Sequence, residues 1–109
     1  MDLQLRAIAQ PTRREILGLI AQGELTSGEI AAQFDLTQPA ISQHLKLLTE
    51  AGLASVRRDG TRRIYRVRLE GLVDLREFIE QMWDVALDRL KQAAEEEERE
   101  RSHGERRQD

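Results

Sequence analysis

Small polar side chains and one lysine alternate with apolar residues in the segment TQPAISQHLKLL, residues 37–48. Glutamine can form two hydrogen bonds with adenine, serine can bond to bases or phosphates, and lysine can reach guanine or a phosphate oxygen. The segment is therefore chemically suited to recognise double-stranded DNA without any covalent step. The candidate contacts are Thr37, Gln38, Pro39, Ser42, Gln43, His44 and Lys46.

A second group of candidate contacts surrounds the dipeptide Asp59–Gly60, which is a strong signal for a β-hairpin turn. Arginines at a hairpin tip can hold DNA phosphates or enter the minor groove. They can also keep an exposed hairpin from pairing with other strand edges, and the two roles do not exclude each other. These candidates are Arg57, Arg58, Arg62 and Arg63.

Charge is distributed unevenly along the 109 residues. The formal net charge is -3, and residues 94–109 account for all of this acidic excess. Residues 37–68 contain seven basic and two acidic side chains, a local net charge of +5. A basic segment within an acidic chain favours a nucleic-acid partner for that segment alone.

Two helices joined by a tight turn must position the segment 37–48. Thr26 and Glu29 match the S/T-x-x-E capping box, which predicts a helix start. Thr37 is expected to be the next N-cap, with Pro39 tolerated in the first turn, and Gly52 should end this second helix. Its apolar residues fall on one face, namely Ile41, Leu45 and Leu48.

The flanking segments complete the expected fold. Two helices should meet at Pro11, the second ending at Gly23, which tolerates a left-handed C-terminal conformation. After the second helix of the pair, residues 54–69 predict two strands, with Tyr65, Val67 and Leu69 alternating toward one side. Helix, turn, helix and hairpin in this order predict a mainly α domain with a small β-hairpin, a winged helix-turn-helix, whose second helix can enter the major groove.

From Leu72 to Leu90 apolar residues recur at three- and four-residue steps, which indicates a helix too apolar to stand alone. We expect a domain over residues 1–93. Residues 94–109 contain no large apolar side chain, and a frayed helix that passes into a disordered, solubilising tail is expected there. An alternative role for this tail is that its acidity discourages nonspecific DNA binding.

The text QPTRREILGLI, ELTSGEIAAQFDLTQPAISQHLKLLTEAGL and VRRDGTRRIYRV resembles the ArsR/SmtB transcriptional repressors over roughly residues 5–90. The resemblance implies a homodimeric winged-helix repressor whose recognition helix carries Ser42, His44 and Leu45. It also implies a dimer interface formed by the first and last helices. The residues expected there are Leu3, Leu5, Ile8, Leu72, Leu75, Phe78, Ile79, Met82, Trp83 and Ala86.

The sequence departs from the metal-sensing members of that family. Thr26 and Gly28 stand where many of them carry two cysteines, and residues 72–90 contain no histidine. The resemblance therefore implies repression of an inverted-repeat operator without a metal switch, with no cofactor and an effector that the sequence does not identify. Alternatives are a protein-interaction module on the same fold and a metal-responsive repressor with an unrecognised site.

Other classes of function find little support in the sequence. There is no cysteine, no glycine-rich phosphate loop and no Ser-His-Asp set, so we expect no enzyme. His44 is expected either to contact the DNA backbone or to be a satisfied residue between helices; His103, the other histidine, lies in the tail, so no zinc pair is expected. Without an apolar run of about 20 residues or a secretory signal pattern, we expect a cytoplasmic protein with no membrane contact.

Overall fold

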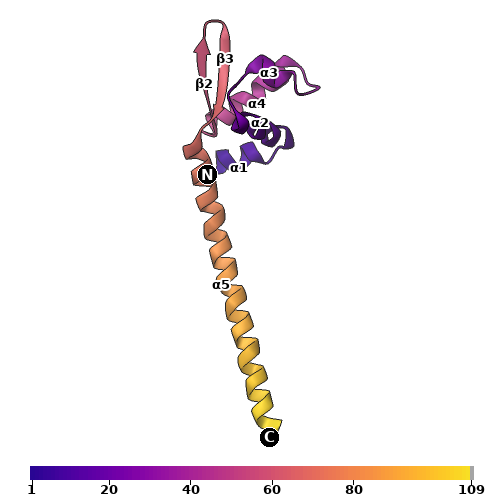
Figure 1. Ribbon diagram of the computed structural model, residues 1–109, viewed down its shortest axis with the longest axis vertical. Helices are drawn as coiled ribbons and strands as arrows, with labels where there is room; N and C mark the ends of the chain where they lie inside the picture. The colour runs from indigo at the N-terminus through magenta and orange to yellow at the C-terminus, as the bar shows by residue number, and fades with distance from the viewer. Residues whose placement is uncertain (109) are drawn as a thin grey trace. The chain divides into compact units, whose positions relative to one another are not determined.

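The computed structural model describes the backbone of residues 1–108 and the side chains of residues 1–102. The chain forms two compact units, Met1–Leu75 and Arg76–Asp109. Its elements, all but β1 labelled in Figure 1, are α1 (Asp2–Ile8), α2 (Pro11–Gln22), β1 (Leu25–Thr26), α3 (Ser27–Ala31), α4 (Gln38–Glu50), β2 (Ala54–Asp59), β3 (Arg62–Val67) and α5 (Leu69–Gln108).

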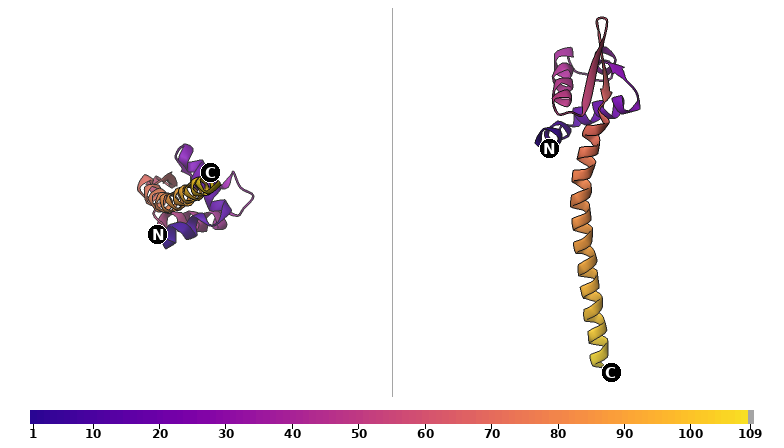
Figure 2. Two further views of the ribbon diagram at one scale, coloured as in Figure 1. Left: turned by 90° about the horizontal axis from the view of Figure 1, so that it is seen from below. Right: turned by 90° about the vertical axis from the view of Figure 1, so that its left-hand side faces the viewer.

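The first unit is a winged helix-turn-helix, as predicted. Helices α3 and α4 form the helix-turn-helix, and the β2–β3 hairpin, the wing, extends beyond the helices of this unit (Figure 2). The sheet has three antiparallel strands in the order β1-β3-β2. Strand β1 was not predicted, because two residues are too few to show an alternating pattern. It pairs Leu25 with Tyr65 and so fastens the wing to the start of α3.

Both predicted helix caps are present. The Glu29 amide donates to Thr26 Oγ1 at 3.1 Å, and the Thr26 amide donates to Glu29 Oε1 at 3.0 Å, which completes the capping box. The same two bonds, from the backbone first, lower the pKa of the Glu29 carboxyl. At the start of α4 the Ala40 amide donates to Thr37 Oγ1 at 3.3 Å, with Pro39 in the first turn. These caps fix where each helix of the pair begins.

The core of the first unit lies behind α4 and against the sheet. Each fully buried side chain stabilises the fold by roughly 1.5–3 kcal/mol relative to exposure. Tyr65 contributes from β3, and Leu75 contributes from the first two turns of α5. The fully buried large side chains are Ile16, Ile30, Ile41, Leu45, Leu48 and Leu53. The three predicted apolar residues of α4 are therefore all in this core.

Three local expectations need correction. The hairpin turn is centred on Gly60 and Thr61, one residue later than predicted, since Asp59 pairs with Arg62. Gly60 has a φ of 65°, and glycine at the first central position is typical of a type II′ turn. Gly23 has an extended φ of 165° rather than a left-handed one, and Leu69 begins α5 instead of ending the strand.

Helix α5 continues through Gln108, which includes the segment expected as a frayed helix, and the expected disorder of the tail stays a prediction. Glutamates and arginines four residues apart, such as Glu95 and Arg99, favour helix in this segment. The predicted domain boundary at residue 93 stays a prediction. The two compact units divide after residue 75. Among the described residues, no helix is long and apolar enough to cross a membrane.

Candidate nucleic-acid interface

The outer face of α4 presents the side chains that the sequence selected. Its inner face is held by three core residues, so the polar side chains point to solvent. The exposed candidates are Thr37, Gln38, Pro39, Ser42, Gln43 and Lys46. The Thr37 hydroxyl already accepts a hydrogen bond as the N-cap, which leaves the other side chains for contact with a ligand.

Two grooves join this face of α4 to the wing. The first, of about 470 Å³, is lined by α4, the start of α3 and the start of β3. The second, of about 320 Å³, lies between α4 and the wing strands. Ser42 and Arg63 line both grooves, so they are the residues at which the recognition helix and the wing meet.

The four wing arginines lie on two faces of the sheet. Residues directly opposite each other in antiparallel strands point to the same face, and successive residues alternate. Arg58 pairs with Arg63, two residues from buried Tyr65, so both share the face that looks toward α4. Arg57 and Arg62 belong to the other face, although Arg62, the first residue of β3, also lines the first groove.

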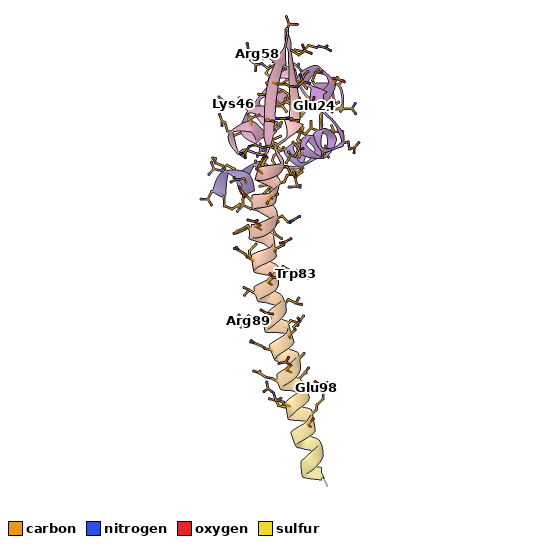
Figure 3. The ribbon with its side chains drawn as sticks, turned by 60° about the vertical axis from the view of Figure 1, so that its left-hand side comes forward. Glu24, Lys46, Arg58, Trp83, Arg89 and Glu98 are labelled. Atoms are coloured by element: carbon orange, nitrogen blue, oxygen red, sulfur yellow. The ribbon has the colours of Figure 1, made fainter. Side chains whose placement is uncertain are left out.

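Arg57 forms an exposed ion pair with an acidic side chain. Its Nη2 donates to Oε2 of Glu24, which Figure 3 labels, at 2.8 Å. The hydrogen bond first, and then the charge of Arg57, lower the pKa of Glu24, while Glu24 raises the pKa of Arg57. The structure therefore favours a local role for Arg57, which the sequence had placed among the DNA contacts.

This ion pair predicts that the wing arginines contribute unequally to the salt dependence of DNA binding. Each phosphate contact adds about 0.9 to the slope of log K against log salt. Arg63→Ala should therefore reduce the slope by about 1.8 for two protomers, whereas Arg57→Ala should leave it nearly unchanged. Fluorescence anisotropy at several salt concentrations checks this, and equal slope changes for both variants would place Arg57 on a phosphate.

His44 faces inward from α4, in contrast to its neighbours Ser42 and Gln43. Its Nδ1 lies 3.3 Å from Nη1 of Arg13, a buried arginine of α2. Burial first, and then the charge of Arg13, lower the pKa of His44. Of the two roles that the sequence left open, the structure favours the satisfied residue between helices over a contact with the DNA backbone.

Several residues of this region were not selected from the sequence. Thr26, Ser27 and Thr61 line the first groove, and Val56 lines the second. The capping box had located the start of α3 but gave no sign that it adjoins the wing. The strict alternation along β2 and β3 could have separated the arginines by face, whereas no local signal indicated the role of Arg13.

The predicted dimer residues fall into two groups. One group packs within the first unit: Leu75 is only 6% exposed in the core, and Leu5, Ile8 and Leu72 are partly buried against it. Leu75 is therefore a core residue rather than a free interface residue. The other group is accessible in the single chain, with Phe78 partly so, and Figure 3 labels Trp83 on α5. This accessible group is Leu3, Phe78, Ile79, Met82, Trp83 and Ala86.

Metal-ligating side chains do not cluster in threes among the residues whose side chains are described. This result concerns groups of histidine, cysteine, aspartate and glutamate within one chain.

Comparisons with known proteins identify the family to which the chain belongs. Residues 10–56 match the family described as bacterial regulatory protein, arsR family. The chain is 42% identical over 86 residues to the HTH-type transcriptional regulator Rv2034 of Mycobacterium tuberculosis, which covers 79% of this chain and 80% of that protein. It is 32% identical over 81 residues to the arsenical resistance operon repressor of Staphylococcus xylosus, covering 74% of each.

A solved structure supports the same assignment. The homodimeric winged helix-turn-helix DNA-binding domain Mb0332 from Mycobacterium bovis matches with a TM-score of 0.63 and 32% identity, over 79% of this chain and 80% of that one. The segment that matches the family contains α3, the whole of α4 with its polar face, and the first three residues of β2. The protein is a member of the ArsR family of DNA-binding transcriptional regulators, and not an enzyme.

Proposed function

We propose that the protein is a homodimeric repressor that occupies an inverted-repeat operator and blocks access to the promoter. The observation that carries this proposal is the joining of the polar face of α4 to the wing at Ser42 and Arg63. A helix of this kind fits the major groove, and the flanking arginines can then hold neighbouring phosphates. A chromosomal operator would place the protein in the cytoplasm.

The homodimer is proposed from the apolar stripe of α5. Ile79, Met82 and Ala86 follow the three- and four-residue steps of a helix seam, with Trp83 beside them. Trp83 is 66% exposed in the single chain, although tryptophan is among the residues that gain most from burial at interfaces. A second copy that pairs along this face would cover it, and Leu3 of α1 would extend the contact.

A two-fold symmetric dimer dictates the form of the operator. Its two recognition helices would enter successive major grooves, so the half-sites should lie about one helical turn apart, roughly 10 base pairs, or a multiple of that spacing. Three or four phosphate contacts for each protomer predict a slope of log K against log salt of about -5 to -7. The candidates for these contacts are Lys46, Arg58, Arg62 and Arg63.

The experiment that tests the function is binding of the purified protein to DNA from upstream of its own gene, against a scrambled competitor, with and without zinc. Specific and salt-sensitive binding, unchanged by zinc, supports a repressor without a metal switch. Release of the DNA by zinc would reveal a metal site in the assembled dimer. Equal binding to the scrambled DNA would contradict the proposal and favour a protein partner. A reporter gene behind the bound fragment then distinguishes repression from activation.

Base readout by α4 gives a further expected result. Gln43→Ala should weaken operator binding and relax the preference at particular base pairs, because each bidentate base contact is worth about 1–3 kcal/mol of discrimination. Arg62→Ala should instead weaken binding to all sequences alike. Selection of bound sequences from a randomised operator measures both effects. If Arg62→Ala changed the preference and Gln43→Ala did not, the two roles would be exchanged.

A further inference from the structure

A buried arginine connects three helices of the first unit. Arg13, only 9% exposed, lies in the first turn of α2. Its Nε donates to the Ala7 carbonyl at 2.7 Å and its Nη2 to the Arg6 carbonyl at 3.0 Å. These carbonyls belong to the last turn of α1, whose carbonyls lack the usual intrahelical partner four residues later, although the Arg6 carbonyl also accepts from the Ala9 amide at 3.3 Å. Its remaining nitrogen faces His44 of α4.

The chemistry of the pair fixes the state of the histidine. A guanidinium carries donors only, so Nδ1 of His44 must be the acceptor of the 3.3 Å contact. An acceptor nitrogen carries no proton, and the ring is therefore neutral with its proton on Nε2. Protonation of His44 would remove this acceptor and place a second positive charge against Arg13.

We infer that Arg13 and His44 are positioning residues that hold the recognition helix against α1 and so set the orientation of its polar face. The inference rests on the proposed function, since that face is the one proposed to read DNA. His44 lies between Ser42 and Lys46 in the sequence but faces the opposite way. It therefore acts on DNA binding through the placement of these side chains, without touching the DNA.

The link also joins the recognition helix to the proposed dimer contact. Helix α1 carries exposed Leu3 at one end and the two carbonyls held by Arg13 at the other. A dimer needs a fixed separation between its two recognition helices in order to match two half-sites. The contacts of Arg13 connect α1, which carries Leu3, with the recognition helix α4.

Acidic pH should break the connection. The charge that acts on the His44 ring is that of Arg13. Other charged side chains on the neighbouring elements include Arg6 of α1, Arg14 and Glu15 of α2 and Glu29 of α3. Lys46 and Glu50 of α4 itself form an exposed pair at 3.9 Å. The folded protein should therefore accept a proton on His44 only below the ordinary pKa of 6.5.

The direction of the stability change follows from this lowered pKa. The unfolded chain protonates His44 first, so the contribution of the neutral ring to stability is complete above about pH 6.5. It is lost progressively as the pH falls from there to the lower pKa of the folded state. Below that value operator binding should weaken as well, since the protonated ring no longer accepts from Arg13.

The test compares His44→Leu, which removes the acceptor, with His44→Asn, whose side-chain oxygen can take the place of Nδ1. At pH 7.5 we expect His44→Leu to lose about tenfold in operator affinity, the usual size of a hydrogen bond from a charged donor. His44→Asn should bind like wild type, and between pH 7.5 and 5.0 it should show a flatter affinity profile. His103→Asn is the matched control and should retain the wild-type profile.

Nitrogen NMR of the wild-type ring keeps the test independent of how well a variant folds. It should show the neutral form with its proton on Nε2 and a pKa below 6.5. A proton on Nδ1, or equal operator affinity of folded His44→Leu and wild type, would overturn the inference. In either case wild type would still bind its operator, whereas absence of specific binding by wild type would refute the proposed function itself.

Discussion

Replacing Ile79 with glutamate is expected to split the dimer and to lower operator affinity by at least about a hundredfold. Ile79 is exposed in the single chain and lies in the middle of the apolar stripe of α5. Symmetry brings the same face of both copies together, so one substitution adds two like charges to the seam. An unpaired charge at a buried seam costs several kcal/mol, and each 1.4 kcal/mol corresponds to a factor of ten in affinity.

Light scattering gives the mass of the variant, and fluorescence of the single tryptophan, Trp83, reports whether its surroundings become polar on dilution. The matched control is Gln81→Glu, which adds the same charge at an exposed position on the other side of α5 and should stay dimeric. An intact dimer with Ile79→Glu would place the interface elsewhere. Leu75 is unsuitable for this test, because a charge there would disrupt the core of the first unit.

Gly71→Ala is expected to destabilise the fold by about 2–3 kcal/mol. Gly71 is buried in the first turn of α5, and a Cβ there would overlap the backbone carbonyl of Gly52, just after α4. Backbone atoms cannot rotate away as a flexible side chain can, so α5 would have to shift. For a domain of this size the melting temperature should fall by about 10–20 °C.

Gly18→Ala is the control for the same chemical change in a helix. Gly18 lies in the interior of α2, and a Cβ there would meet no atom within 4 Å. Because alanine favours helix, this variant should gain about 0.5–1 kcal/mol instead. Thermal unfolding of both variants checks that Gly71→Ala lowers the melting temperature and that Gly18→Ala raises it. If Gly71→Ala melted at the wild-type temperature, the close approach of α5 to Gly52 would not exist in solution.

The structure also changes how much of the positive charge of residues 37–68 is expected to face DNA. Arg57 is paired with Glu24, an acidic residue that lies outside residues 37–68. The local charge of +5 over residues 37–68 therefore overstates what is free to meet DNA. The arginines that share the grooves beside α4 carry the electrostatic part of the proposed interface.

Local patterns in the sequence were enough to predict the helix-turn-helix, the wing and the polar face of α4. Each rests on signals that act over a few residues: the Thr26–Glu29 capping box, the Thr37 cap and the three apolar residues that turn one face of α4 inward. Caps and amphipathic spacing depend on neighbours three or four residues apart, so they can be read without the rest of the chain. The position predicted for the hairpin turn was still wrong by one residue, because the register of a hairpin depends on how its strands pair.

The tertiary structure alone decided which of the selected side chains are free to act. His44 meets Arg13 across 31 residues of sequence, and Arg57 meets Glu24 across 33. Leu75, spaced like a seam residue, is instead taken into the core of its own chain. Contacts of this kind depend on how elements that are distant in the sequence pack against one another, and this packing leaves no local pattern in the sequence.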